Sequence, residues 1–161
     1  MGILESFGVK EGQGKYYEEA VYSLVLIYNT LYDSVSRYLE PHGLTPGKLN
    51  ILLAIKHQGG AEGIRQVELS KRLIVTPSNM TKLIDKLEKE GLVTRSALAG
   101  DRRVNLMKIT PQGTKLLDEV WAGYNQKLKD LVGVLPLARQ KELSRTLLQW
   151  FGILKIKQEN R

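Results

Sequence analysis

Hydrophobic residues recur at helical spacing through most of the chain, and the pattern predicts long amphipathic helices at both ends. One stripe steps by three and four residues and predicts a helix from Tyr16 to about Leu39. Thr45-Pro46, Thr110-Pro111 and Pro136 mark three further helix starts, because Thr is a good N-cap and Pro fits the first helical position. Residues 1–15, glycine-rich and largely polar, predict a flexible N-terminal tail.

Two short helices are predicted between residues 66 and 91. The buried side of the first consists of Val67, Leu69 and Leu73. The second has Thr76 as its N-cap and Pro77 as its first residue, and it ends at Gly91, where a positive φ is usual. Its apolar face consists of Met80, Leu83, Ile84 and Leu87. Two such helices joined by a tight turn form a helix-turn-helix, whose second helix enters the major groove of DNA.

The residues after Gly91 predict a small β-hairpin. Alternation predicts strands over Leu92–Arg95 and Val104–Ile109, with the loop Ser96–Arg103 between them. A one- or two-residue strand at Ile64 is expected to join this sheet. A basic hairpin behind a helix-turn-helix is a wing, and its arginines suit a narrow, strongly negative minor groove.

The candidate DNA contacts lie on the second short helix and on the wing. They are Thr76, Ser78, Asn79, Thr81, Lys82 and Lys86 on the helix, and Arg95, Asp101, Arg102 and Arg103 on the wing. Hydroxyl, amide and ammonium groups hydrogen-bond to base edges and phosphates. The alternative is that they are solvated surface residues, an alternative that stays open most evenly for Arg102. Arg95 is expected to pair with Asp101 or with a phosphate.

Charge and composition narrow the class of protein. Residues 1–64 hold five Lys/Arg against seven Asp/Glu, whereas residues 65–103 hold nine against five and residues 104–161 ten against five. The basic excess therefore starts with the helix-turn-helix, although basic soluble proteins are common. The absence of cysteine excludes disulfides, and two histidines alone make no metal site. We predict no cofactor, no membrane span and a cytoplasmic location. No phosphate loop, nucleophile motif or metal-ligand cluster indicates an enzyme.

The ordered motifs resemble the MarR (multiple antibiotic resistance regulator) family of bacterial winged-helix transcription factors. The matching segments are LSKRL, TPSNMTKLIDKLEKEGLV, DRR and LMKITPQG, preceded by GLTPGKLNILLAI. The resemblance implies that Asp101 and Arg103 brace the wing and reach the minor groove. The chain departs from the family at Arg65, where a hydroxyl or acidic residue usually caps the first short helix.

The aromatic residues of the first helix have two interpretations. The resemblance implies a small aromatic or lipophilic effector, bound between the dimerisation helices and the winged helix, with Tyr28, Tyr32 and His42 as candidate contacts. Packing in a core or interface explains the same residues equally well, since an aromatic stripe at heptad spacing is usually packing.

Together these patterns predict a mainly α fold with a small β wing, in one domain over residues 16–161. The winged-helix core spans 44–117, and the helices over 16–40 and 111–158 dimerise it, because their apolar faces exceed what the core covers. The predicted function is a homodimeric regulator of transcription that binds double-stranded DNA. It would repress from a pseudo-palindromic operator and be released by a small ligand. The alternative is a winged-helix protein-interaction module without specific operator binding.

Overall fold

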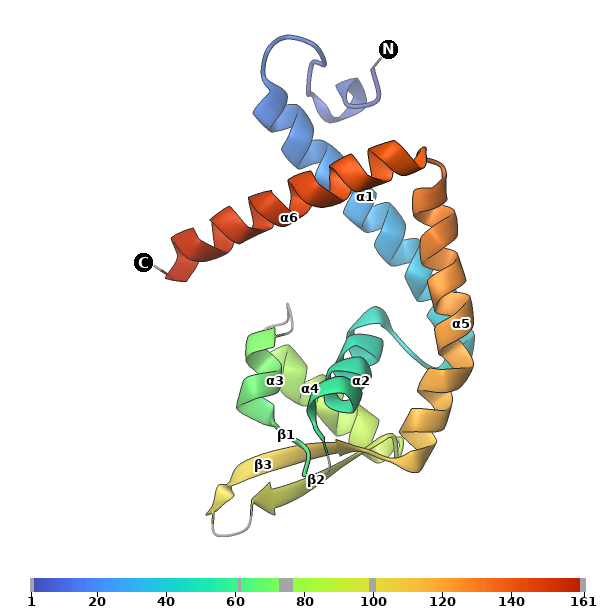
Figure 1. Ribbon diagram of the computed structural model, residues 1–161, viewed down its shortest axis with the longest axis vertical. Helices are drawn as coiled ribbons and strands as arrows, with labels where there is room; N and C mark the ends of the chain where they lie inside the picture. Colours follow the sequence, from blue (N-terminus) through green and yellow to red (C-terminus); the bar gives the residue numbers. More distant parts are fainter. Residues whose placement is uncertain (1, 61, 73–76, 99–100, 160–161) are drawn as a thin grey trace. The chain divides into compact units, whose positions relative to one another are not determined.

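The computed structural model describes residues 2–60, 62–72, 77–98 and 101–159 (Figure 1). Within these ranges the side chains of residues 72, 77, 78, 98, 101–104, 158 and 159 lie outside the described part. The chain forms two compact units, Met1–Ala122 and Gly123–Arg161. The single domain expected over residues 16–161 stays a prediction.

The fold is mainly α with one small antiparallel sheet, as the sequence predicted. Its helices and strands are, in order, η1 (Glu5–Phe7), α1 (Tyr16–Leu39), η2 (Glu40–His42), α2 (Pro46–Gln58), β1 (Ile64–Arg65), α3 (Gln66–Arg72), α4 (Pro77–Lys89), β2 (Val93–Leu98), β3 (Asp101–Ile109), α5 (Pro111–Gly133) and α6 (Leu137–Glu159). In Figure 1, α2, α3 and α4 gather beside the sheet, and β2 and β3 project from them as a hairpin.

The helix boundaries follow from local chemistry. Thr45 Oγ1 accepts a hydrogen bond from Lys48 N at 3.3 Å, and Thr110 Oγ1 accepts one from Gly113 N at 3.0 Å. Both threonines therefore cap helices that begin with proline, as predicted. Gly43 and Gly91 have φ of 68° and 70°, the left-handed conformation that ends a helix at little steric cost in glycine.

The hydrophobic core of the first unit lies where α2 and α4 meet the end of α1, the sheet and the start of α5. Its fully buried large side chains are Leu39, Leu49, Ile51, Leu52, Ile55, Leu69, Met80, Ile84, Leu87, Val93, Met107 and Leu117. The predicted apolar stripe of α4 is confirmed, with Leu83 half-buried. Val67, in contrast, is 64% exposed, so its predicted burial was wrong. Leu73 lies outside the described residues.

The sheet has the order β1-β3-β2, and both pairings are antiparallel. Ile64 pairs with Met107, which confirms the short strand expected at Ile64. The wing strands are longer than predicted, because pairing continues through Ser96 and Ala97 to a bulge between Ala97 and Leu98. The predicted loop Ser96–Arg103 was therefore too long. Backbone pairing extends the hairpin into residues whose side chains do not alternate.

The N-terminal segment contains more structure than a featureless tail. Residues Glu5–Phe7 form a 3-10 helix, and both Leu4 and Val9 are buried. Leu4 N donates to Glu11 Oε1 at 2.6 Å, and Gly12 N donates to Glu19 Oε1 on α1 at 2.9 Å. The flexibility predicted for residues 1–15 stays a prediction.

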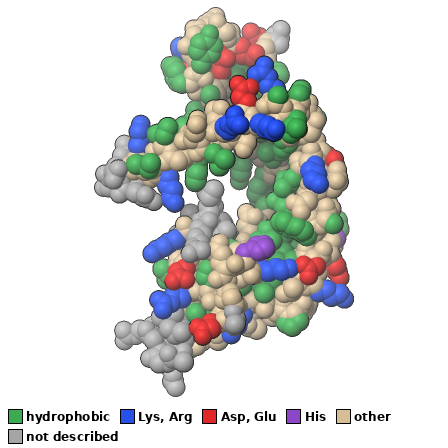
Figure 2. Space-filling view, viewed as in Figure 1, with side chains coloured by type: hydrophobic (Ala, Val, Ile, Leu, Met, Phe, Trp, Pro, Cys, Tyr) green, Lys and Arg blue, Asp and Glu red, His purple; other side chains and the backbone are tan. Residues whose placement is uncertain are grey.

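The second unit consists of the end of α5 and all of α6. Helix α6 starts at Leu137, one residue after the predicted Pro136, because the Pro136 carbonyl accepts the first helical hydrogen bond from Gln140 N. Hydrophobic side chains lie at the surface of α6, with Lys and Arg among them (Figure 2). The exposed ones are Leu137, Leu143, Leu147, Leu148, Phe151, Ile153, Leu154 and Ile156. Burial raises the pKa of the Tyr124 phenol, which stays neutral at physiological pH.

Candidate nucleic-acid interface

Helix α4 presents two chemically different faces. Met80, Ile84 and Leu87 are buried at helical spacing and fix one face against the core. The exposed predicted contacts of α4 are Asn79, Thr81, Lys82 and Lys86. Neither lysine forms an ion pair with another residue in the described part of the chain. The helix therefore carries polar groups and two available positive charges on the side away from the core.

Thr81 accepts a hydrogen bond from the neighbouring helix, α3. Gln66, the first residue of α3, donates from Nε2 to Thr81 Oγ1 at 3.2 Å. This contact joins the start of α3 to the exposed face of α4. The sequence did not indicate Gln66 as part of this surface, since the two residues have no regular spacing.

Several predicted contacts lie outside the described part of the chain. Thr76 lies outside the described residues, and so do the side chains of Ser78, Asp101, Arg102 and Arg103. The backbone of Asp101–Arg103 forms the first part of β3. The roles predicted for these five residues stay predictions.

Arg95 links the wing to α4. Its Nη2 lies 2.5 Å from Asp85 Oδ1, and its Nε lies 3.6 Å from Glu88 Oε2. The predicted alternatives, Asp101 or a phosphate, did not include these partners. Asp85 and Glu88 are three residues apart on one helix, so their side chains share a face, and that spacing was the available signal. The contact fixes the start of β2 against α4.

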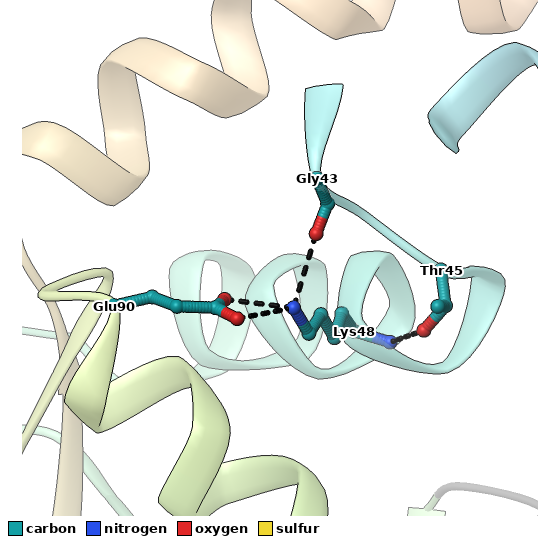
Figure 3. Close-up of polar contacts among 4 residues, drawn as sticks. All are labelled: Gly43, Thr45, Lys48 and Glu90. Atoms are coloured by element: carbon teal, nitrogen blue, oxygen red, sulfur yellow. Dashed lines mark hydrogen bonds and ion pairs between the residues drawn. The ribbon is translucent and has the colours of Figure 1, made fainter. Parts of the chain in front are cut away.

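Lys48 makes a second link to the end of α4 (Figure 3). Its buried Nζ lies 2.6 and 2.8 Å from the two carboxylate oxygens of Glu90, and 3.0 Å from the carbonyl oxygen of Gly43. Lys48 lies in the first turn of α2, and Glu90 directly follows α4. No local pattern indicates this pair, because its members are 42 residues apart.

The three candidate effector contacts do not form one cluster within the chain. The rings of Tyr28 and Tyr32 are 5.8 Å apart, whereas the ring of His42 lies 5.7 Å from that of Tyr38. Ten residues of helix separate Tyr32 from His42 by about 15 Å. His42 lines an open cavity of about 570 Å³, together with Gly43, Glu90, Leu92, Gln112, Lys115, Leu116 and Glu119.

Neither a metal centre nor a membrane span is found in the part of the chain that the structure describes. Across residues 2–60, 62–72, 77–98 and 101–159, no three His, Asp or Glu side chains are grouped to bind a metal ion. No helix within the same ranges is both long and apolar enough to cross a bilayer.

The paired helices α3 and α4, followed by a β-hairpin, define the class of winged helix-turn-helix proteins. The MarR family model matches residues 44–104, which cover α2 to the beginning of β3. Over these residues the chain is similar to the MarR family.

Relatives and solved structures extend the likeness over most of the chain. The HTH-type transcriptional regulator MhqR of Bacillus subtilis is 25% identical over 126 residues, which cover 78% of this chain and 84% of MhqR. The structure of Sco3205, a MarR family transcriptional regulator from Streptomyces coelicolor, in complex with DNA, has a TM-score of 0.79 at 22% identity, covering 87% of this chain and 92% of Sco3205. The structure of CouR from Rhodococcus jostii, bound to p-coumaroyl-CoA, has a TM-score of 0.71 at 24% identity and covers 84% of this chain and 93% of CouR. At these identities the structures show a shared fold.

Proposed function

We propose that this protein is a DNA-binding transcriptional regulator that represses from a pseudo-palindromic operator as a homodimer and is released by a small ligand. The observation that carries the proposal is the exposed polar face of α4, with Lys82 and Lys86, beside the wing. A helix with one face fixed in the core and polar groups on the other suits the major groove. The relationship to MhqR, a transcriptional regulator, and to Sco3205, solved with DNA, supports it. The protein would act where DNA lies, in the cytoplasm.

The dimer follows from the exposed hydrophobic surface of the terminal helices. The exposed hydrophobic residues of α1 are Tyr16, Tyr17, Val21, Tyr22, Leu24, Val25, Ile27, Tyr28 and Tyr32, and α6 has a similar set. Surfaces of this size on a soluble protein mark an association site, and a twofold interface pairs a surface with itself. Two copies of α4 would then bind half-sites one helical turn apart, about 34 Å.

Repression and release rest on the geometry of such a dimer. A dimer that covers two half-sites blocks access of polymerase to the same DNA. An effector releases the operator only if it binds the DNA-binding conformation of the dimer less tightly than a conformation that does not bind the operator. The exposed pair Tyr28 and Tyr32 offers aromatic surface on α1, and CouR, bound to p-coumaroyl-CoA, supports an aromatic or lipophilic class. His42 would contact a ligand only from the separate cavity beside Glu90.

The proposal is tested by fluorescence titration of duplexes that the protein selects from genomic DNA. Lys86→Ala should weaken binding to selected and scrambled duplexes alike. It should also reduce the magnitude of the negative slope of log K against log salt by about 1. Lys115→Ala, which removes the same charge from an exposed position on α5, should leave that slope unchanged. Equal slopes for both variants would contradict a phosphate contact at Lys86. Failure of the parent to distinguish the duplexes would favour an interaction module.

A further inference from the structure

We propose that Lys48 is a positioning residue for operator recognition, which sets the orientation of α4 without contacting DNA. The proposal rests on the DNA-binding function inferred above. It concerns a residue that lies away from the exposed face of α4.

The ammonium group of Lys48 is fully committed to protein partners. Its side chain is 9% exposed, and its three N–H donors match three contacts, two with the Glu90 carboxylate and one with the Gly43 carbonyl (Figure 3). Charge-assisted contacts of this length are strong and directional. Lys48 therefore has no donor left for a phosphate, and its role must act through Glu90 and Gly43.

The contact adds a directional restraint on α4 that hydrophobic packing does not supply. Burial of a single stripe on α4 is non-directional, so the helix could turn or slide slightly against α2. At Gly47 the two helices approach closely, since a Cβ built there would lie 3.1 Å from Leu83 Cδ1. Glu90, which directly follows α4, is seven residues or about two helical turns beyond Leu83, so the two side chains leave the helix on the same side. Gly47 and Lys48 thus hold α4 at two points along its length.

The same lysine reaches the end of the first helix. Gly43 follows η2, which continues directly from α1. Lys48 consequently joins three segments: the turn that ends α1, the first turn of α2 and the end of α4. In a dimer built on α1, this connection would transmit the position of the dimerisation helix to the recognition helix.

The burial of the pair is asymmetric, and this makes the proposal testable. The Glu90 side chain is 41% exposed, whereas that of Lys48 is nearly buried. Lys48→Met removes the buried charge, fills a similar volume and leaves Glu90 able to bind water. Removal of Glu90 would instead leave an unpaired buried ammonium, which is the costly half of such a pair. Lys48→Met is therefore expected to fold and to lose only the directional link.

Lys56→Met is the matched control. It removes the same charge from the same helix and breaks an ion pair of equal length, 2.6 Å to Asp118 on α5, but both partners are accessible to water. The parent and both variants would be titrated with a duplex selected by the parent and with a scrambled duplex of equal length. Lys48→Met should bind the selected duplex about tenfold more weakly and the scrambled duplex within about twofold of the parent. The affinity of Lys56→Met for both duplexes should remain within about twofold of that of the parent.

Undiminished binding of the selected duplex by a folded Lys48→Met would overturn the positioning role, as would equal losses on both duplexes. If circular dichroism shows that Lys48→Met does not fold, Glu90→Gln is titrated with the same two duplexes instead. If neither variant folds, the pair serves stability alone and the proposal is overturned. A parent that does not discriminate between the duplexes would instead overturn the DNA-binding function, and this proposal with it.

Discussion

Arg95 illustrates how a single side chain holds the wing and α4 together. The guanidinium lies between Asp85 and Glu88, and its side chain is 26% exposed. The two carboxylates are one turn apart on α4 and repel each other unless a cation lies between them. Arg95 therefore contributes to stability besides any contact with DNA.

Arg95→Met should lower the free energy of unfolding by about 1 kcal/mol, because the half-buried pair is lost and two like charges remain. Equilibrium urea unfolding measures the change. Arg139→Met is the control, since it breaks a 2.8 Å pair with Glu142 whose members are 71% and 65% exposed. The control should stay within about 0.5 kcal/mol of the parent. Equal losses in the two variants would show that the Arg95 contacts add nothing.

For single residues, the sequence predicted the exposure of the α4 side chains better than it predicted the partners of the charged residues. Helical spacing separates Met80 and Ile84 from Lys82 and Lys86 without knowledge of the rest of the fold. The partners of Arg95 and Lys48 depend instead on how strands and helices approach one another. Pairs of this kind have no periodic signal in one sequence.

At the element scale, the start of α5 is docked tightly onto the sheet. Thr110 N donates to the Leu92 carbonyl at 3.1 Å, just before α5 begins. A Cβ built at Gly113 would lie 2.3 Å from the same carbonyl oxygen and 2.9 Å from Ile109 Cγ1. Glycine at this position is required by close approach and not by its φ.

Gly113→Ala should therefore destabilise the protein by about 1–3 kcal/mol, since backbone must move to admit the methyl group. Gly133→Ala, at the end of the same helix, meets no heavy atom within 4 Å and should be neutral or stabilising by up to about 1 kcal/mol. Thermal unfolding of the two variants measures both effects. A Gly113→Ala protein as stable as the parent would rule out the close docking of α5.

The elements themselves were largely predictable, and the exceptions have physical causes. Thr-Pro starts and the glycines at 43 and 91 set helix ends through local geometry. The wing strands extend beyond the predicted alternation because their hydrogen bonds join backbone to backbone, whatever the side chains. Val67 was assigned to the core on hydrophobicity alone, although single exposed hydrophobic residues are common.

For the whole molecule, the proposed binding to a pseudo-palindromic operator requires two copies of the chain. Sedimentation velocity should give about twice the 18.2 kDa mass of the chain. Ile27→Glu places a charge on the exposed hydrophobic surface of α1 and should shift the protein towards monomer and weaken operator binding. Asn50→Glu adds the same charge to an exposed position of α2 and should leave the dimer intact. A monomeric parent that still binds a palindromic duplex tightly would contradict the dimer.

The amphipathic terminal helices indicate association, but a single sequence does not specify how two copies meet. Interface geometry depends on long-range packing between chains, which no local pattern encodes. In the proposed dimer, packing between the two chains therefore sets the spacing of the α4 helices.

The most direct test attaches a DNA-cleaving iron chelate to α4. The chain has no cysteine, so Lys82→Cys provides a single attachment point, and Asp33→Cys on α1 provides a control. On a selected duplex the Lys82 conjugate should cut in two clusters about 10 base pairs apart, each centred on a major groove, while the Asp33 conjugate cuts neither. Uniform or absent cutting from Lys82 would contradict the claim that the exposed face of α4 lies in the grooves of the operator.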